Sequence, residues 1–187
     1  MTAVTDTGLV LADGESIPAD LILLAAGVAP NVELAAAAGL AVANGIVTDA
    51  GLITADPAIS ALGDCCAFPD PQSGRPIRLE SVQAATDHAR TIARRLVAGR
   101  AEPYAALPWF WSDQADWKLQ IAGLAASEDG AVETETGAIC RFAGDVLAAV
   151  ETVNDARSHM LARRLLVGPA PVSRDRLAAR GYDLTAT

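Results

Sequence analysis

The first candidate for chemistry is the aspartate of a Gly-Asp pair. Residues 59–62 are mainly apolar and predict a strand that runs directly into Gly63 and Asp64. Glycine allows a tight turn, and α/β sheets bind their ligands at the carboxyl ends of their strands. An ionised carboxylate at that place can accept strong hydrogen bonds from the hydroxyl groups of a polyol. The alternative is that the pair only forms a turn, which is a common use of glycine and aspartate.

The second candidate is the start of a predicted helix. Apolar residues recur at helical spacing over residues 82–96, and Ser81 and Gly99 are placed to cap and to end that helix. Free N–H groups and the positive end of the helix dipole gather at such a start and favour negative charge. Every helix has a polarised start, so an ordinary capped helix is the alternative for Ser81, Val82 and Gln83.

The third candidate is an aromatic run, Pro-Trp-Phe-Trp-Ser-Asp-Gln, at residues 108–114. Two tryptophans so close together are unusual in a chain that is only 4% aromatic. The flat indole of Trp111 suits the wall of a site for an aromatic cofactor, and its N–H group can donate a hydrogen bond. A core cluster is the alternative, and we expect Trp109 and Phe110 to lie in the core or to face a partner.

Cysteine and histidine offer no chemistry of their own. The three cysteines include no C-x-x-C pair, and the neighbours Cys65 and Cys66 cannot form a disulfide without strain. We therefore expect buried thiols in a reducing compartment, and neither a disulfide framework nor a thiol–disulfide enzyme. His88 and His159 lack the spacing of metal ligands, so no metal site is expected.

The composition limits the class of protein. A chain of 187 residues with 51% hydrophobic residues can form one or two domains with a sizeable core. Its net charge of −9 argues against nucleic-acid binding. It has no apolar run long enough to span a membrane and no signal peptide at Met1, so a cytoplasmic location is expected. Arginines gather on three predicted helices, either as solvated helix faces or as a docking surface for an acidic partner.

The order of the predicted elements indicates an α+β fold. The apolar run at residues 19–26 predicts a strand covered on both faces, and Asn31 is placed to cap a short helix. Ser173 is placed to cap a last short helix. The other predicted elements are strands at residues 46–48, 52–54, 118–124, 138–142 and 146–153 and a helix at residues 154–167.

Four motifs, taken in order, resemble one known family. They are Ala-Leu-Gly-Asp at residues 61–64, Arg-Leu-Glu-Ser-Val-Gln at 78–83, the aromatic run at 108–114 and Leu-Gln-Ile-Ala-Gly at 119–123. In this order they look like the C-terminal half of the FAD-dependent ferredoxin reductases that serve oxygenases. These reductases are of the putidaredoxin-reductase and biphenyl-dioxygenase-reductase type, in the pyridine nucleotide-disulfide oxidoreductase superfamily. The resemblance covers nearly the whole chain.

The resemblance implies a role for each candidate residue. Asp64 would hold the ribityl chain of FAD, and the helix start at residues 81–83 would stabilise negative charge on the reduced isoalloxazine. Trp111 would stand beside the isoalloxazine, on the side where an electron leaves. Glu80 would lie close to the place where nicotinamide stacks, and a surface carboxylate near a helix start is the alternative for this residue.

The resemblance also implies a domain organisation. Residues 1–28 would end an NAD-binding domain, residues 29–107 would form the second segment of an FAD-binding domain, and residues 108–187 would form a reductase C-terminal domain. That last domain would hold a three-stranded antiparallel sheet and helices, so the fold is expected to be α+β with an α/β remnant. The chain has neither of the family's two Gly-rich phosphate loops, so we expect the N-terminal FAD and NAD domains to be missing from it.

In the resembled family, the complete enzyme takes electrons from NAD(P)H onto FAD and passes them to a small iron–sulfur ferredoxin. The sequence therefore predicts a fragment of such an oxidoreductase, and we expect the chain alone to bind FAD weakly or not at all. The alternative is a truncated or split polypeptide that is no enzyme by itself and acts as a structural, dimerisation or partner-docking module. The pattern favours neither NADH nor NADPH, and no particular oligomeric state.

Overall fold

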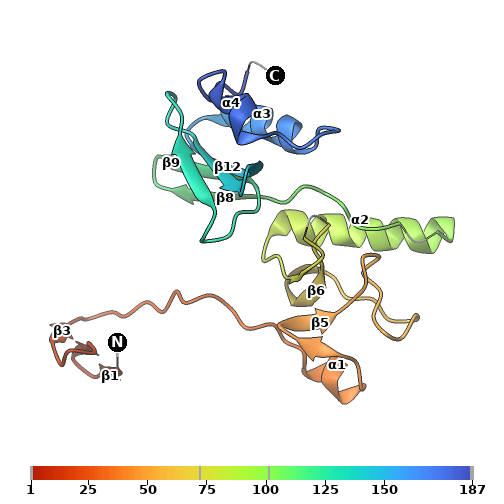
Figure 1. The fold of residues 1–187 in the computed structure, drawn as a ribbon. Coiled ribbons are helices and arrows are strands. Elements are labelled where there is room, and N and C mark those ends of the chain that lie inside the picture. Colours follow the sequence, from red (N-terminus) through yellow and green to blue (C-terminus); the bar gives the residue numbers. More distant parts are fainter. Residues whose placement is uncertain (1, 72, 101, 186–187) are drawn as a thin grey trace. The chain divides into compact units, whose positions relative to one another are not determined.

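The computed structural model describes residues 2–71, 73–100 and 102–185. It divides the chain into two compact units, Met1–Pro30 and Asn31–Thr187 (Figure 1). The described residues form both helices and strands, and most of their strand pairs are antiparallel, which confirms the α+β class. None of the helices in this part of the chain is long and apolar enough to cross a membrane.

The first unit contains a small antiparallel sheet in the order β1-β2-β3. Its strands are β1 (Ala3–Thr5), β2 (Gly8–Val10) and β3 (Ser16–Pro18). Each strand has three residues, so the sheet has little apolar surface to bury and contributes no large core of its own.

The strand predicted at residues 19–26 is wrong. These residues form no strand, and the side chains of Leu21 and Leu23 are 88% and 87% exposed. A strand requires neighbours that accept and donate its backbone hydrogen bonds, and none of the described strands pairs with this segment. The apolar run predicted a buried strand, but burial in a sheet also requires neighbouring strands, which apolar residues alone do not indicate.

The second unit begins with a small mixed sheet in the order β4-β5-β6-β7. Its strands are β4 (Val42–Ala43), β5 (Gly45–Val47), β6 (Cys66–Pro69) and β7 (Pro76–Ile77), accompanied by the helices α1 (Glu33–Ala37) and α2 (Val82–Ala98). β5 and β6 form the one parallel pair among the described strands, which is the α/β remnant of this fold. Its buried cluster joins Leu52, Phe68, Leu79 and Tyr104.

The predicted cap is confirmed for α2 and is wrong for α1. Ser81 caps α2, because its Oγ atom accepts a hydrogen bond from the Ala84 N–H group (3.1 Å), and Gly99 ends that helix. The cap predicted at Asn31 is wrong. α1 begins one residue further along, so that Val32 stands at the cap position, and no side chain accepts a hydrogen bond there.

A larger antiparallel sheet follows in the order β10-β11-β12-β9-β8. Its strands are β8 (Trp109–Gln114), β9 (Trp117–Gly123), β10 (Gly130–Glu133), β11 (Ile139–Ala143) and β12 (Val146–Val153). The strands predicted at residues 118–124, 138–142 and 146–153 are confirmed as β9, β11 and β12, with shifts of about one residue at their ends. The expected three-stranded sheet has five strands instead, because β8 and β10 pair with its edges.

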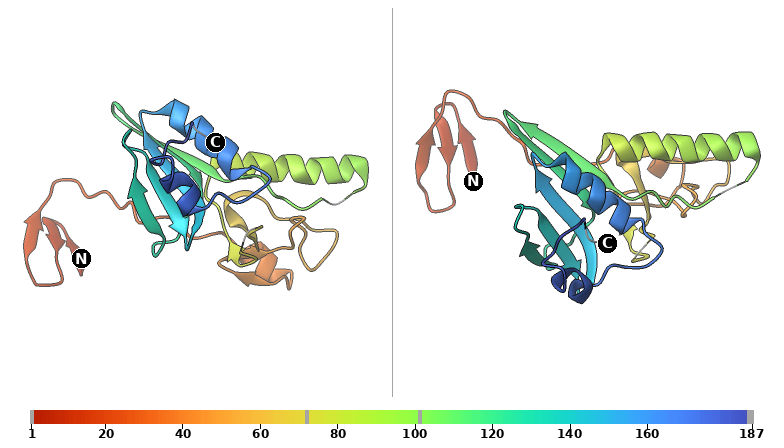
Figure 2. Two further views of the ribbon diagram at one scale, coloured as in Figure 1. Left: turned by 45° about the horizontal axis from the view of Figure 1, so that its top comes forward. Right: turned by 90° about the horizontal axis from the view of Figure 1, so that it is seen from above.

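Two helices cover this sheet. α3 (Ala156–Leu166) packs against β12 and β9, and α4 (Arg174–Ala178) lies nearby, as Figures 1 and 2 show. Ser173 caps α4 as predicted, and Asp155 caps α3 by accepting a hydrogen bond from the Ser158 N–H group (2.9 Å). Both helices therefore have polar caps that satisfy N–H groups at their starts.

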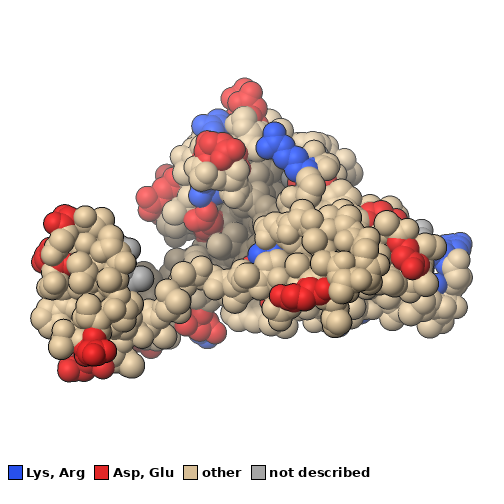
Figure 3. Space-filling model, turned by 90° about the horizontal axis from the view of Figure 1, so that it is seen from below, with Lys and Arg blue, Asp and Glu red and all other residues tan. Residues whose placement is uncertain are grey.

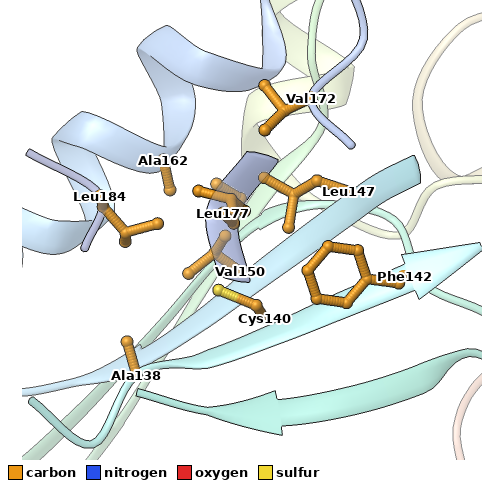
Figure 4. Packing of buried hydrophobic residues seen from close by; sticks show 10 residues of the cluster. Ala138, Cys140, Phe142, Leu147, Val150, Ala162, Val172, Leu177 and Leu184 are labelled. Carbon is orange, nitrogen blue, oxygen red and sulfur yellow. The ribbon is translucent and has the colours of Figure 1, made fainter. Parts of the chain in front are cut away.

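The core of this part lies between the sheet and its helices (Figure 4). Phe142 and Val150 project from β11 and β12, while Ala162 comes from α3 and Leu177 from α4. All four are essentially inaccessible to solvent. This packing makes the sheet a rigid support for its edge strand β8.

Gly123 is a point at which the sheet tolerates no side chain. Its φ angle is +84°, and an added Cβ atom would overlap the carbonyl oxygen of Ala148 on β12. Gly137 has nearly the same φ angle, +81°, but an added Cβ atom would meet nothing within 4 Å. The two glycines therefore form a matched pair that separates backbone strain from steric overlap.

We predict that Gly123→Ala lowers the free energy of unfolding by roughly 3 kcal/mol or more, whereas Gly137→Ala costs only about 1–2 kcal/mol for the positive φ angle. Urea unfolding followed by tryptophan fluorescence measures both losses. The three tryptophans lie between residues 109 and 117, so the signal reports on the second unit. Equal losses in the two variants would mean that the strand moves to accommodate the methyl group.

Candidate functional site

Asp64 lies in a short 3₁₀ turn, Gly63–Cys65, which comes immediately before β6. The prediction that a strand runs into this residue is wrong. Residues 59–62 form no strand, and their one pairing is an isolated bridge between Ile53 and Ser60. That bridge is also all that remains of the strand predicted at 52–54. The carboxylate of Asp64 is nevertheless exposed, so it is free to meet a ligand.

Two side chains hold this turn in place. The Gly63 N–H group donates to Nδ1 of His88 (3.1 Å), and Nη1 of Arg78 donates to the carbonyl oxygen of Asp64 (2.9 Å). His88 is fully buried on α2, and this burial lowers its pKa to about 4, although the nearby Asp87 carboxylate acts in the opposite direction. The imidazole is therefore neutral at neutral pH, as an acceptor nitrogen must be.

Arg78 also connects this turn to Glu80. The same Nη1 atom lies 2.6 Å from Oε1 of Glu80, and the Arg78 side chain is only 9% exposed. The Glu80 carboxylate is thus part of an ion pair and lies at the surface. Two of the predicted site residues, Asp64 and Glu80, are linked through one guanidinium group that the sequence did not identify as functional.

The start of α2 is open to a ligand. The Ser81 hydroxyl accepts the Ala84 N–H group, whereas the N–H groups of Val82 and Gln83, at the first two helical positions, have no acceptor within the helix. Val82 stands at the first helical position with its side chain 68% exposed. The N–H groups of Val82 and Gln83 and the positive end of the helix dipole can therefore face negative charge from outside.

Gln83 connects the start of α2 to β8. Its Oε1 atom accepts a hydrogen bond from the Trp109 N–H group (3.3 Å), and its Nε2 atom donates to Oδ2 of Asp87 (2.5 Å). The side chain is buried. Both ends of the amide are thus used inside the protein, so a contact of Gln83 with a ligand would come from its backbone.

The two tryptophans of β8 lie on one face of the strand. Their ring centroids are 5.3 Å apart, and the Arg163 guanidinium lies 4.8 Å from the centre of the Trp109 ring. Trp109 is half-buried and Trp111 is 45% exposed. Phe110 projects to the opposite face, where it packs against the cluster around Phe68, so it belongs to the core.

An open groove of about 420 Å³ brings the helix start and the tryptophans together. It is lined by Val82, Gln83, Thr86, Asp87, Arg90, Trp109, Trp111 and Arg163. Three of the predicted site residues, Val82, Gln83 and Trp111, meet in this groove, whereas Asp64, Glu80 and Ser81 are not among its lining residues. The groove offers an apolar side chain, a flat indole and the positive end of a helix, which suits an aromatic ring that carries negative charge.

The cysteines and histidines form no second reactive or metal-binding site among the described residues. Burial raises the pKa of both Cys66 and Cys140 to about 11, so these thiols stay protonated and unreactive at neutral pH. Cys65 is partly buried, and all three cysteines are free. Within the described ranges, no group of histidine, cysteine, aspartate and glutamate is placed to hold a metal ion.

Two family models match the chain. The model described as "Reductase C-terminal" matches residues 109–187, and the model described as "Pyridine nucleotide-disulphide oxidoreductase" matches residues 2–89. The first match ends within α2 and the second begins at the first residue of β8, the two elements that Gln83 connects.

Curated proteins of similar sequence are bacterial reductases. Rhodocoxin reductase of Rhodococcus erythropolis is 44% identical over 95% of this chain and 42% of its own length. Putidaredoxin reductase of Pseudomonas putida is 37% identical over 95% of this chain and 43% of its own length. The chain therefore spans less than half the length of these relatives.

Solved structures agree with this likeness. The ferredoxin reductase of the CYP199A2 system from Rhodopseudomonas palustris superposes with a TM-score of 0.87 at 45% identity, covering 96% of this chain and 45% of that chain. The reductase in a covalent putidaredoxin reductase–putidaredoxin complex superposes with a TM-score of 0.82 at 36% identity, over 93% of this chain and 43% of that chain.

The buried His88 predicts a pH dependence of stability. Its folded pKa is lowered to about 4 from an ordinary value of 6.5, so between these values the unfolded chain binds a proton that the folded chain does not. The stabilisation is complete above about pH 6.5, and as the pH falls to about 4 we expect a loss of roughly 2–3 kcal/mol.

Urea unfolding at several pH values measures this loss, and His88→Gln is the control because it removes the titrating group. His159 also has a pKa lowered by burial, so the difference between the parent and variant curves isolates His88. If the free energies of unfolding of the parent and of His88→Gln changed in parallel over pH 4–6.5, His88 would have an ordinary pKa in the folded protein.

Proposed function

Because the chain belongs to the pyridine nucleotide-disulphide oxidoreductase family, we propose that it forms one wall of the FAD site of a cytoplasmic ferredoxin reductase. Such an oxidoreductase passes electrons from NAD(P)H through FAD to an iron–sulfur ferredoxin that serves an oxygenase. The observation that carries the proposal is the groove in which the start of α2 meets Trp111. The names of the similar proteins, rhodocoxin reductase and putidaredoxin reductase, support the class of electron acceptor.

The residues of the chain fit FAD in their donor and acceptor chemistry. The exposed carboxylate of Asp64 would accept hydrogen bonds from ribityl hydroxyl groups, and the backbone N–H groups of Val82 and Gln83 would face the pyrimidine end of the isoalloxazine. Trp111 would provide a flat wall beside the ring. Bound FAD would supply the hydride and single-electron chemistry.

Glu80 is the candidate nearest to the nicotinamide. Its ion pair with Arg78 fixes the carboxylate at the edge of the proposed site rather than leaving it mobile. We propose that it acts there by its position and its negative charge.

We further propose that residues 1–28 end an NAD-binding domain, residues 29–107 form the second segment of an FAD-binding domain, and residues 108–187 form the reductase C-terminal domain. The division of the chain after Pro30 supports the first boundary. The family match at residues 109–187 supports the second. The sequence has no Gly-rich phosphate loop, so the chain alone would bind FAD weakly or not at all.

The proposed partner is an acidic ferredoxin. Arg90 and Arg163 line the groove beside the tryptophans, whereas Arg95 is used inside the protein, where it donates to Gly51 and Ser60. On the face that Figure 3 shows, basic and acidic side chains form small separate groups and no continuous basic patch. We expect the positive charge that docks the ferredoxin at Arg90 and Arg163 beside the groove. The rate of association is then expected to fall as the salt concentration rises.

A second candidate function is that of a structural, dimerisation or docking module that is no enzyme by itself. The exposed apolar side chains of Leu96 and Val97 on α2 favour it, because they offer surface for another polypeptide. Flavin content separates the two candidates. The test protein is a fusion of this chain to the N-terminal part of rhodocoxin reductase that the chain does not match, and bound flavin near one per fusion supports the first candidate.

In that fusion, we predict that Asp64→Ala weakens FAD binding about 10–100-fold, because it removes a charge-assisted hydrogen bond worth roughly 1.5–3 kcal/mol. Titration of the apoprotein with FAD measures the change. Asp116→Ala, which removes another exposed carboxylate from the turn between β8 and β9, is the control and should have no effect. Unchanged FAD affinity in the Asp64 variant would mean that this residue only forms a turn.

We also predict that Trp111→Ala in the fusion slows the reduction of ferredoxin roughly tenfold and affects the reduction of flavin by NADH much less. Trp111 would stand where the electron leaves, whereas hydride arrives on the nicotinamide side. Stopped-flow measurement of the two half-reactions tests this. Trp117→Ala, which removes an exposed tryptophan outside the groove, is the control. Equal slowing of both half-reactions by Trp111→Ala would indicate general damage to the flavin site.

A further inference from the structure

The turn that carries Asp64 is fixed on both of its sides by buried polar side chains. We propose that His88 and Arg78 are positioning residues that set the place and direction of the Asp64 carboxylate. This inference rests on the proposed role of Asp64 in binding FAD. It adds to that role the two side chains that hold the carboxylate ready for its ligand.

His88 fixes the turn from its N-terminal side. Its Nδ1 atom accepts the Gly63 N–H group at 3.1 Å, across 25 residues of sequence. The imidazole is fully buried and is held by edge-on contacts with Phe68 and Tyr104, whose ring centroids lie 4.9 and 4.5 Å away. A ring held from two sides cannot turn away, so its acceptor stays aimed at Gly63.

The other ring nitrogen of His88 indicates that packing alone does not account for a histidine, rather than an apolar ring, at this position. Nε2 is buried without a hydrogen-bond partner among the described residues, and a buried polar atom without a partner is unfavourable. An apolar ring would fill the same space without that penalty. The contribution that distinguishes histidine at this position is therefore the acceptor that it presents to Gly63.

Because of the backbone conformation at Gly63, this hydrogen bond affects the direction in which the Asp64 side chain points. Gly63 has a φ angle of +67°, in the left-handed region, and the chain therefore turns at the residue directly before Asp64. A hydrogen bond to the Gly63 N–H group orients the peptide that enters this turn. A change in that peptide would redirect the side chain that follows it.

Arg78 fixes the turn from its C-terminal side. Its guanidinium donates to the carbonyl oxygen of Asp64 (2.9 Å) and to Oδ1 of Asn44 (3.3 Å), and pairs with Glu80 (2.6 Å). These three partners come from three different segments, and the side chain is nine-tenths buried. Because the guanidinium is planar and rigid, its contacts determine one another's directions.

Together the two contacts hold the backbone on either side of Asp64. His88 binds the N–H group of the preceding residue, and Arg78 binds the carbonyl group of Asp64 itself. Only the side-chain torsions of Asp64 remain to be set when a ligand binds. Such preorganisation reduces the entropic cost of binding.

The first test uses the chain itself. His88→Phe keeps a ring for Phe68 and Tyr104 but removes the acceptor, whereas His88→Gln offers an amide oxygen in its place. Amide hydrogen exchange followed by NMR should show about tenfold or greater loss of protection at Gly63 in His88→Phe, partial recovery in His88→Gln, and no change at Val150 in the other core. Unchanged protection at Gly63 in His88→Phe would overturn the role of His88.

The second test uses the flavin-binding fusion and a double-mutant cycle. We expect His88→Phe and Arg78→Met each to raise the FAD dissociation constant about fivefold or more while Asp64 is present, and to add little in the Asp64→Ala background. Arg78→Met keeps an unbranched side chain of similar length and tests the inference independently if His88→Phe does not fold. Arg78→Lys should recover part of the affinity.

The outcomes separate this inference from the proposed function. No effect of Asp64→Ala on FAD affinity would contradict the proposed function, whatever the exchange at Gly63 shows. If Asp64→Ala weakens binding but the effects of His88→Phe and Arg78→Met persist in full without Asp64, the two residues act on general structure, and the positioning role is overturned.

Discussion

A hydrogen bond from β8 to the start of α2 joins the two halves of the candidate site. The Trp109 N–H group, at the first residue of β8, donates to the side-chain oxygen of Gln83 at the start of α2 (3.3 Å). The residues matched by the two family models meet at this contact. Since Gln83 is buried and its amide also binds Asp87, this contact restrains the helix start relative to the tryptophans. The groove between them depends on that relation.

Side chains of α2 also hold the other parts of the site by hydrogen bonds to backbone N–H groups. Its start faces the groove, Gln83 binds β8, and one and a half turns further along His88 binds the turn that carries Asp64. A helix is a stiff element, so displacements at one of these points are transmitted to the others. The carboxylate, the polarised helix start and the indole wall are therefore held by one element, although they lie in three different segments.

The sequence predicted the parts of this arrangement that local chemistry determines. The cap at Ser81, the end at Gly99 and the strands β9, β11 and β12 follow from short-range signals. The strand at residues 19–26 and the strand before Asp64 were wrong, because a strand also requires partners that apolarity does not reveal. β8 was not predicted as a strand, since its aromatic residues were interpreted as a cofactor wall or as core and not by their alternation along a strand. The contacts of Gln83, His88 and Arg78 join residues 14–26 positions apart and have no local signature.

The central claim is that Asp64 and the start of α2 face the same flavin. A crystal structure of the FAD-loaded fusion tests it most directly. We expect a carboxylate oxygen of Asp64 within hydrogen-bond distance of a ribityl hydroxyl group, about 2.5–3.0 Å, and the backbone N–H groups of Val82 and Gln83 directed at the pyrimidine end of the isoalloxazine beside Trp111. A flavin bound with the Asp64 carboxylate in solvent and the start of α2 directed away from the ring would contradict the claim.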